Sequence, residues 1–282
     1  MRPLVVSHPT ILRGPSMVGH FCLSSSSSRL SGRKAWIAME VASPIMFFYT
    51  FLKSPLSGGS LEPNLSQLIL AGLFLVHYTN RTFISPLRTP SRSRSHIIVP
   101  LNAFFLNILN GSLLGSYLSS PDAHTYLEPS KTLTCPRFYL GVALWFLGFV
   151  GNVAHDEILS NIRKKAKAKG KTQAGKEYYA IPHGLLFDYV SFPNYLCEWV
   201  EWLGFALAAA PFPVMAPSQL SPSQLLVAPA RYFAPSLTAP YIFVLVEILF
   251  MFPRAYRSQQ WYRKTFGDAF PKDRKIVIPF LL

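Results

Sequence analysis

Six runs of apolar residues, each close to the length of a membrane-spanning helix, constrain this chain more than any other feature. Only 14% of the 282 residues are charged, against about 25% in an average soluble domain. The runs largely lack the polar stripe of helical period that a soluble helical protein would show. They cover residues 35–52, 65–84, 97–118, 137–158, 196–214 and 237–252. The sequence therefore predicts an all-α polytopic membrane protein with about six transmembrane helices.

The connections between these runs alternate between basic and nearly uncharged. Arginine and lysine gather before the first run, after the second, after the fourth and after the last. Because basic connections stay on the cytosolic side of a membrane, this alternation predicts six crossings with both chain ends cytosolic. The formal net charge of +14 follows mainly from that topology, so it does not point to nucleic-acid binding.

Three segments outside the runs have a distinct composition. Residues 1–34 lack acidic residues and include five consecutive serines, which fits a disordered arm better than a transit peptide. The lysine-rich stretch 164–177 predicts a basic cytosolic loop near anionic headgroups. Seven prolines within 211–240 prevent a continuous helix there and predict a lumenal loop. We therefore expect one transmembrane domain, over residues 35–282.

The cysteines and histidines do not form a metal or disulfide pattern. Cys22, Cys135 and Cys197 are widely separated, and none has a partner at CxxC spacing. His155 stands beside Asp156, but no second histidine or cysteine follows at ligand spacing. We expect no metal, and we interpret Cys197 as a small packing residue.

Glu40 lies inside the first apolar run, where an unpaired carboxylate is costly. It must either pair with a cation or carry its proton, and a protonated carboxyl group can polarise a carbonyl oxygen. A glutamate that caps a helix near the interface is the structural alternative. Spacing alone leaves both open.

Three further polar groups lie at membrane boundaries. HYTNRTF (77–83) ends the second run with His77, Tyr78, Asn80 and Arg81. In GNVAHDEILSNIRKK (151–165) and SFPNYLCEWVEWLG (191–204), polar residues recur at steps of four and three, which places each set on one helical face. These sets are Asn152, Asp156, Ser160 and Arg163 in the first segment and Asn194, Glu198 and Glu201 in the second.

The predicted topology brings these polar groups to the cytosolic side of the membrane. Arginines among amides and carboxylates can seat a phosphorylated nucleotide, because the guanidinium fork binds phosphate oxygens. Neither GxGxxG nor a Walker sequence is present, so neither standard nucleotide-binding fold applies. The residues therefore predict a polar, cytosol-facing cavity with a buried acid and room for a lipid-like substrate.

Taken in order, several motifs resemble the steroid 5α-reductase (3-oxo-5α-steroid 4-dehydrogenase) family over about residues 33–282. The terminal IPF and the order of the motifs make the resemblance specific. The motifs are AWIAMEVASP (35–44), HYTNRTF (77–83), LNG (109–111) followed by Gly115 and Tyr117, NVAHDEIL (152–159), YAIPHGLLFDYVSFPNYLCEWVEWLGFALA (179–208) and FPKDRKIVIPFLL (270–282).

The resemblance implies an enzyme of the endoplasmic-reticulum membrane that uses NADPH to reduce the Δ4 double bond of a 3-oxo steroid. Hydride would reach C5 and a proton C4, while Glu40 and Tyr78 hold the 3-ketone. Arg92 matches a further phosphate contact in looser register. The positions that match residues around NADPH are Arg81, Asn152, Asp156, Arg163, Tyr179, Asn194, Glu198, Arg254 and Tyr262.

The chain also departs from the family pattern. Met39, Leu185 and Cys197 replace residues common at their positions, and the loops 164–177 and 211–240 look like insertions. The family has seven spans, and residues 1–34 cannot supply the first. A truncated gene model is our preferred explanation over a dispensable helix, and a restored helix would place the N-terminus in the lumen.

Two alternative functions stay open beside reduction of a steroid or other lipid enone. One is a sister activity of the superfamily, the reduction of polyprenal or of a very-long-chain trans-2-enoyl-CoA. The other is a non-catalytic, lipid-binding relic of the fold. The expected partners are membrane lipids and a lipid substrate, with no nucleic acid.

Overall fold

The structure is a computed structural model, and it describes residues 29–30, 32–57, 62–90, 95–170, 179–213 and 238–281. The described part is helical except for one pair of two-residue strands, β1 (Arg29–Leu30) and β2 (Ser95–His96), which pair antiparallel. The predicted all-α class is thus confirmed. The helices are α1 (Gly32–Glu40), α2 (Ala42–Lys53), α3 (Leu65–Thr79), the π-helix η2 (Asn80–Ile84), α4 (Ser85–Arg88), α5 (Ile98–Leu118), α6 (Pro121–Tyr126), α7 (Pro129–Thr132), α8 (Pro136–Ala168), the 3-10 helix η3 (Leu185–Asp188), α9 (Pro193–Ala209), α12 (Ala239–Phe266) and the 3-10 helix η5 (Gly267–Ala269).

Four helical segments of the described chain are long and apolar enough to cross a membrane. The two other predicted spans, α3 and α9, have 15 and 17 residues, and a crossing helix needs about 20. The helical backbone after α3 continues through η2 and α4 to Arg88. The four segments are Gly32–Lys53, Ile98–Leu118, Pro136–Ala168 and Ala239–Ala269.

Some predicted boundaries were wrong. The run expected at 196–214 stops being helical at Ala209, before Pro211 and Pro213. The first residues of the predicted loop 164–177 are helical, since α8 continues to Ala168. An ion pair within this helix, between Lys164 Nζ and Glu157 Oε1 at 3.0 Å, stabilises its end. Helix α1 likewise begins at Gly32, inside the expected arm. Residues 1–28, 171–178 and 214–237 lie outside the described residues. They make up most of the three segments of distinct composition.

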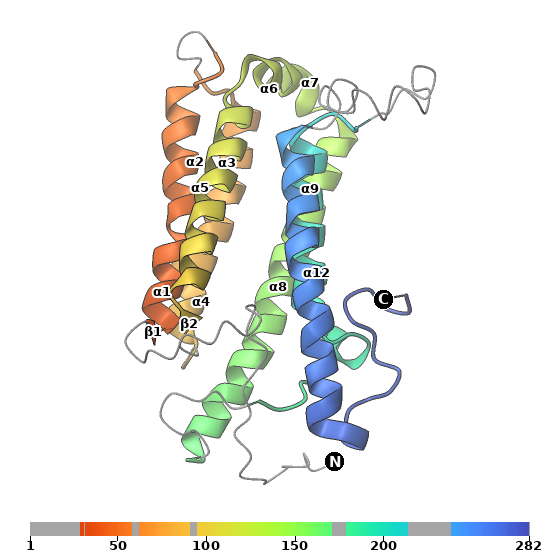
Figure 1. The fold of residues 1–282 in the computed structure, drawn as a ribbon. Coiled ribbons are helices and arrows are strands. Elements are labelled where there is room, and N and C mark those ends of the chain that lie inside the picture. Colours follow the sequence, from red (N-terminus) through yellow and green to blue (C-terminus); the bar gives the residue numbers. More distant parts are fainter. Residues whose placement is uncertain are drawn as a thin grey trace, which may run out of the picture.

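The helices form two groups that run roughly parallel to a common axis (Figure 1). One group contains α2, α3 and α5, and the other contains α8, α9 and α12; α6 and α7 lie at one end between them. The most extensive helix pairs are α8 with α9 and α2 with α5. Successive long helices alternate in direction, as the predicted up-and-down crossing requires.

A layer of buried aromatic rings joins the two groups. Phe47 of α2 stacks on Phe74 of α3 with ring centroids 4.0 Å apart. Phe74 contacts Trp202 of α9 at 5.9 Å, and Trp202 meets Phe243 of α12 edge-on at 4.6 Å. All four side chains are fully buried. We call these four residues the aromatic layer.

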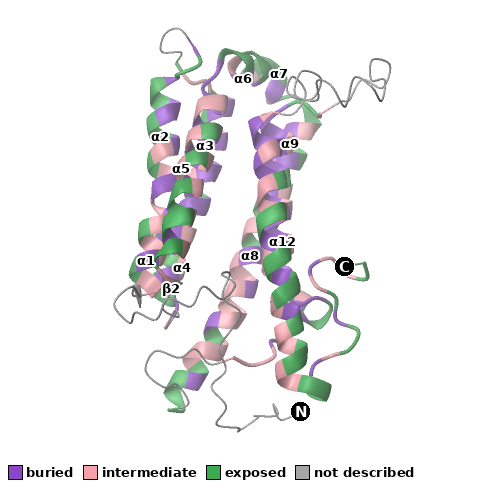
Figure 2. Cartoon of the chain, in the orientation of Figure 1, coloured by how far each residue is buried: buried purple, intermediate pink, exposed green. Residues whose placement is uncertain are grey.

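The outward faces of the long helices are apolar. Figure 2 shows exposed residues on the outer sides of both groups. An apolar surface of this extent is unusual for a soluble monomer and typical of helices in lipid. Large apolar side chains that are at least half exposed include Ile45, Phe48 and Leu52 on α2, Leu101, Phe105 and Leu109 on α5, Phe146, Leu147 and Val150 on α8, and Leu249 and Phe250 on α12.

Glycines allow the backbones of α8 and α9 to approach closely. A Cβ atom on Gly148 would overlap the backbone nitrogen of Glu201 and the carbonyl oxygen of Cys197. Gly141 and Gly204 form similar contacts along the same interface. Small residues commonly permit such close packing between membrane helices. Gly148 therefore sets the separation of the helices that carry Asn152 and Glu198.

We expect Gly148→Ala to lower the free energy of unfolding by about 1–3 kcal/mol, because the added methyl group meets backbone on the facing helix. The matched control is Gly72→Ala on α3, where a Cβ would meet nothing within 4 Å. That control should leave stability equal or slightly higher, since alanine favours helix over glycine. Thermal unfolding of both purified variants in detergent measures the difference, and equal melting temperatures would contradict the close contact.

Candidate active site

Arg81, on η2, pairs with residues of α1 and α9. Its Nη1 lies 3.1 Å from Oε1 of Glu198 on α9, and its Nε lies 3.5 Å from Oε2 of Glu40 at the end of α1. The indole Nε1 of Trp36 donates a hydrogen bond to the Arg81 carbonyl oxygen at 3.1 Å, and the guanidinium lies 5.3 Å from the centroid of the same indole ring. One cation thus balances two buried carboxylates.

Helix α8 extends this group through amide hydrogen bonds. Nδ2 of Asn152 donates to Oε2 of Glu198 at 3.2 Å and to the Asn194 carbonyl oxygen at 3.1 Å. Nδ2 of Asn194 donates to Oδ1 of Asp156 at 3.2 Å. The sequence placed Asn152 with Asp156 and Asn194 with Glu198 on common faces, and these two faces meet. We call the linked residues the Arg81 network, and its members are Glu40, Arg81, Asn152, Asp156, Asn194 and Glu198.

The local sequence explains how α3 and α9 present these groups. The π-helical turn after Thr79 interrupts the regular ladder where Arg81 stands, and such turns are frequent at functional sites. Helix α9 begins with Pro193 at its first turn, which places Asn194 and Glu198 near its N-terminus. Both features position network residues at helix irregularities or ends, not in the middle of a regular span.

The C-terminal segment holds the start of α9 in place. The backbone N–H groups of Ser191 and Phe192 donate to the carbonyl oxygens of Lys275 and Ile276 at 2.9 and 3.0 Å. Nη1 of buried Arg274 donates to the Pro182 carbonyl oxygen at 3.1 Å. The terminal motif that carries the family resemblance therefore orients Asn194 and Glu198 indirectly, by fixing the segment that precedes them.

A second buried pair lies beside the network. Nδ1 of His77 on α3 is 2.7 Å from Oε1 of Glu201 on α9, and the His77 ring packs edge-on against Trp202 at 4.7 Å. Glu201 therefore joins α9 to the neighbouring helix α3. Its other oxygen, Oε2, is buried without a hydrogen-bond partner in the described part of the chain.

Tyr78 directly follows His77 near the end of α3 and precedes Arg81 of η2 by three residues. Its side chain is buried, and its ring lies 4.6 Å from the ring of Phe74. The phenol is within electrostatic reach of Glu40 and Arg81. The structure therefore brings together the two residues nominated from the sequence to hold a ketone.

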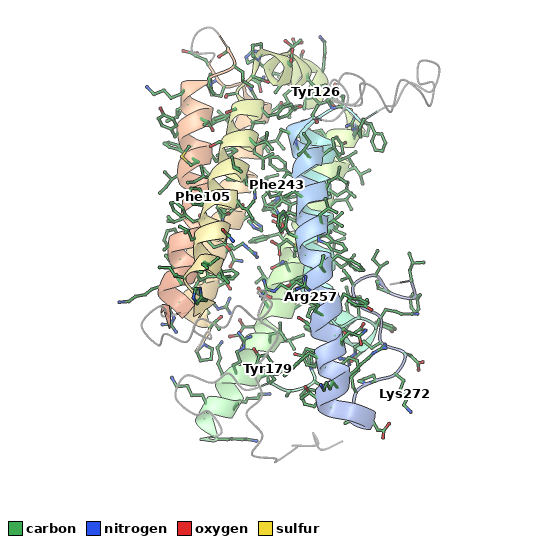
Figure 3. The ribbon with its side chains drawn as sticks, in the orientation of Figure 1. Phe105, Tyr126, Tyr179, Phe243, Arg257 and Lys272 are labelled. Carbon is green, nitrogen blue, oxygen red and sulfur yellow. The ribbon has the colours of Figure 1, made fainter. Side chains whose placement is uncertain are left out.

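The remaining predicted cofactor residues lie nearer the end of the bundle. Arg254 is in electrostatic contact with Tyr195, which also interacts with Glu198. Arg163 follows Asp156 by two turns of α8, or roughly 10 Å along the axis. Tyr179 packs edge-on against Trp261, and Tyr262 stacks on Phe266. Figure 3 marks Tyr179 in this lower part of the molecule, and Arg92 lies outside the described residues.

Glu247 on α12 was not nominated from the sequence. It is the only charged residue in the apolar run 237–252, and a lone charge in such a run is the sequence feature that could have identified it. Its carboxyl group is in electrostatic contact with Arg81, Glu198 and Glu40. Glu247 therefore borders the Arg81 network from a helix that contributes none of the network's members.

His155 and Cys197 have structural contacts. Nδ1 of His155 donates to the Gly151 carbonyl oxygen at 2.6 Å, and its Nε2 accepts from the Leu186 N–H at 3.3 Å. The buried Cys197 thiol lies 3.7 Å from His155 Nδ1. Both ring nitrogens of His155 are thus engaged, and Cys197 packs as predicted.

An apolar groove of about 430 Å³ lies between α9 and α12. It contains none of the Arg81 network, because the network residues of α9 point to the opposite face of that helix. The groove belongs to the apolar outer surface, and the polar chemistry lies inside. Its lining residues are Leu196, Trp199, Val200, Leu203, Pro213, Tyr241, Val244, Leu245 and Ile248.

The fold and the site together define a class. The protein is a multi-pass, all-helical membrane protein whose interior holds a linked set of carboxylates, amides and one arginine near the helix ends. Tyr78 and Glu40 are both buried in this interior. Such a site suits a polar cofactor that meets an apolar substrate.

Comparison with known proteins identifies the family. The family model described as 3-oxo-5-alpha-steroid 4-dehydrogenase matches residues 93–234 and 230–282. An uncharacterized protein of Schizosaccharomyces pombe is 36% identical over 274 residues, which cover 91% of this chain and 86% of that protein. The 3-oxo-5-alpha-steroid 4-dehydrogenase 1 of Mus musculus is 34% identical over 267 residues (95% and 88%), and the steroid 5-alpha-reductase DET2 of Solanum lycopersicum is 31% identical over 265 residues (93% and 86%). The chain belongs to the 3-oxo-5-alpha-steroid 4-dehydrogenase, or steroid 5α-reductase, family.

Proposed function

We propose that this protein uses NADPH to reduce the Δ4 double bond of a 3-oxo steroid or sterol. The observation that carries the proposal is the position of Arg81, which pairs with Glu40 on one side and Glu198 on the other. Glu40 is the residue expected at the substrate ketone, and Glu198 is one expected at the cofactor. A single guanidinium that touches both supports a site in which cofactor and ketone meet.

The residues of the Arg81 network fit NADPH. Oδ1 of Asn194 is buried and has no hydrogen-bond partner in the described part of the chain, so it can accept from a carboxamide N–H. Glu198 can accept a second such bond, and basic residues nearer the helix ends can contact phosphate. The chemistry that bound NADPH supplies is donation of the hydride that reaches C5. The residues proposed to hold it are Arg81, Asn152, Asp156, Arg163, Tyr179, Asn194, Glu198, Arg254 and Tyr262.

Glu40 and Tyr78 contact the ketone oxygen in this proposal. The Tyr78 hydroxyl donates a hydrogen bond, and Glu40 donates a second when its carboxyl group carries a proton. Only Oε2 of Glu40 is paired with Arg81, and the 3.5 Å separation exceeds the roughly 2.8 Å of a charge-assisted hydrogen bond. Both donors stabilise the negative charge that grows on the oxygen as C5 is reduced, and C4 then takes a proton.

The aromatic layer closes the inner side of the site. Phe74, Trp202 and Phe243 are fully buried, and Trp202 contacts the other two rings one turn from Glu198, so the packed rings exclude water from that side. Such exclusion strengthens the hydrogen bonds from Tyr78 and Glu40, because the local dielectric constant is low.

The proposal includes a six-span topology in the endoplasmic-reticulum membrane. Helix α3 with its continuation to Arg88, together with α9, completes the four longer candidate spans. The basic ends of α4, α8 and α12 then face the cytosol, where NADPH is available, and both chain ends lie on that side.

A substrate panel tests the function. Purified protein in lipid nanodiscs receives NADPH with a 4-ene-3-one steroid, a polyprenal or a long-chain trans-2-enoyl-CoA, and products are separated by mass. The proposal expects the steroid to be reduced with the highest kcat/KM. Preference for either other enone would reassign the substrate, and absence of NADPH binding would favour the lipid-binding relic.

We expect Asn194→Ala and Asp156→Ala to raise the Kd for NADPH about 10-fold or more, because each removes a partly buried hydrogen-bonding group of the network. The matched control is Asp268→Ala, whose carboxylate is fully exposed near the end of α12. Isothermal titration of the three purified variants provides the comparison. Unchanged NADPH affinity in the two network variants would count against the proposed cofactor site.

A further inference from the structure

Glu247 lies on the side of α12 that faces the interior. Phe243 precedes it by four residues and Arg254 follows it by seven, so the three residues share one helical face. This face points toward α9, because the Phe243 ring meets the Trp202 ring of α9 at a centroid distance of 4.6 Å within the aromatic layer. In Figure 3, Phe243 lies in the upper half of α12 and Arg257 in the lower half, and Glu247 falls between these two heights.

The neighbours of Glu247 are the groups of the candidate active site. Its carboxyl group interacts electrostatically with Glu198, Arg81 and Glu40. The Tyr78 phenol is in electrostatic contact with Glu40 and also with Glu247. The carboxyl group therefore interacts with both the expected cofactor contact Glu198 and the expected ketone contact Tyr78.

The carboxyl groups around Glu247 outnumber the cations that pair with them. Glu247 interacts electrostatically with three other carboxyl groups, those of Glu40, Glu198 and Glu201. Arg81 pairs with the first two and His77 with the third. Within the described part of the chain, Glu247 has no ion pair and no hydrogen bond.

A carboxyl group without a cation in a low-dielectric interior is more stable in its protonated form. In that form it has an O–H donor to offer, as well as an acceptor oxygen. Two polar atoms nearby, Oε2 of Glu201 and Oδ1 of Asn194, are buried without hydrogen-bond partners among the described residues. A ligand with polar atoms at this level would meet that capacity.

We propose that protonated Glu247 donates a hydrogen bond to the carbonyl oxygen of the enone, beside the Tyr78 hydroxyl. This inference rests on the proposed function and adds a catalytic residue to it. No proton is transferred from Glu247: its O–H bond stays intact, and the hydrogen bond strengthens as negative charge develops on the oxygen. Glu247 is suited to this role because, unlike Glu40, it forms no ion pair with Arg81.

Two substitutions separate a donor from a structural carboxyl group. Glu247→Leu removes the donor, and we expect kcat to fall about 10²-fold with a much smaller change in KM, since the bond strengthens mainly in the transition state. Glu247→Gln keeps a donor and should stay within about threefold of wild type. Both variants should retain the wild-type melting temperature and NADPH affinity. Wild-type turnover in Glu247→Leu, or an equal loss in both variants, would overturn the donor role.

An infrared measurement tests the same inference without turnover. The ligand-free protein should show the carbonyl band of a protonated carboxylic acid that Glu247→Gln lacks and that the exposed-site control Glu128→Gln retains. Addition of a saturated 3-oxo steroid, which cannot be reduced at C4–C5, should shift this band. A missing band, or a band that the ketone does not move, would overturn the inference. A wild-type protein that reduces no enone would instead overturn the proposed function, and the infrared result still decides whether Glu247 donates to a ketone.

Discussion

Arg81→Met is expected to lower the free energy of unfolding by about 3–5 kcal/mol, because it leaves two buried carboxylates without their cation. The side chains of Glu40 and Glu198 are only 6% and 4% exposed, so water cannot replace the guanidinium. The same substitution should reduce NADPH affinity, since Glu198 loses the group that fixes its orientation. Chemical denaturation in detergent, followed by tryptophan fluorescence, measures the first effect.

Arg88→Met is the matched control, because it removes an arginine that also pairs with a glutamate. The Arg88 Nη2 lies 2.9 Å from Oε2 of Glu157, but the two side chains are 51% and 31% exposed. A pair so accessible to solvent contributes about 0–1 kcal/mol. Adding Glu198→Gln to Arg81→Met should recover part of the lost stability, because one uncompensated carboxylate disappears. Equal destabilisation by the two single substitutions would contradict the account of Arg81 as a buried counter-ion.

Glu40→Gln should lower kcat about 10²–10³-fold while the Kd for NADPH changes less than about threefold. The amide keeps the shape of the side chain, but it is a weaker donor than a carboxylic acid. Unlike the change at Glu247, it also removes the ion pair with Arg81 that orients the side chain at the ketone, and loss of one oriented donor has effects of this size. Arg81 retains Glu198 as a partner at 3.1 Å, so the cofactor side of the network persists. Steady-state kinetics gives kcat and NADPH titration gives the Kd, both measured on one preparation of the variant.

The control for Glu40→Gln is Glu128→Gln, which changes a solvent-exposed carboxylate that is paired with Lys131 at the far end of the bundle. It should leave both kcat and NADPH affinity at wild-type values. If Glu40→Gln weakened NADPH binding as strongly as it slowed turnover, Glu40 would belong to the cofactor contacts and not to the ketone site.

Hydropathy predicted the helices well because a membrane helix is specified locally, by about 20 apolar residues. Its predictions failed at the ends, where other physics applies. Helix α8 extends beyond its apolar part since alanine and lysine favour helix in water as well, and α9 stops early at two prolines. The π-helical turn at Asn80–Ile84 has no local signature in the sequence, so the position of Arg81 was not predictable from periodicity.

Helical spacing predicted which polar residues share a face, but not which faces meet. Asn152 with Asp156, and Asn194 with Glu198, follow from the period of one helix. The contact between them depends on Gly148, which lets α8 and α9 approach. Glu247 was missed because a single carboxyl group has no period, and only the packing of Phe243 against Trp202 reveals its direction.

Transfer of an isotopic label from NADPH to a steroid would reveal the proposed reaction itself. Purified protein in nanodiscs is given a 4-ene-3-one steroid and NADPH that carries deuterium at the transferable position of the nicotinamide, and the product is examined by mass spectrometry and NMR. We expect one deuterium at C5 of the product and a solvent-derived hydrogen at C4. Tight NADPH binding with no label in any steroid product, or label at a carbon other than C5, would contradict it.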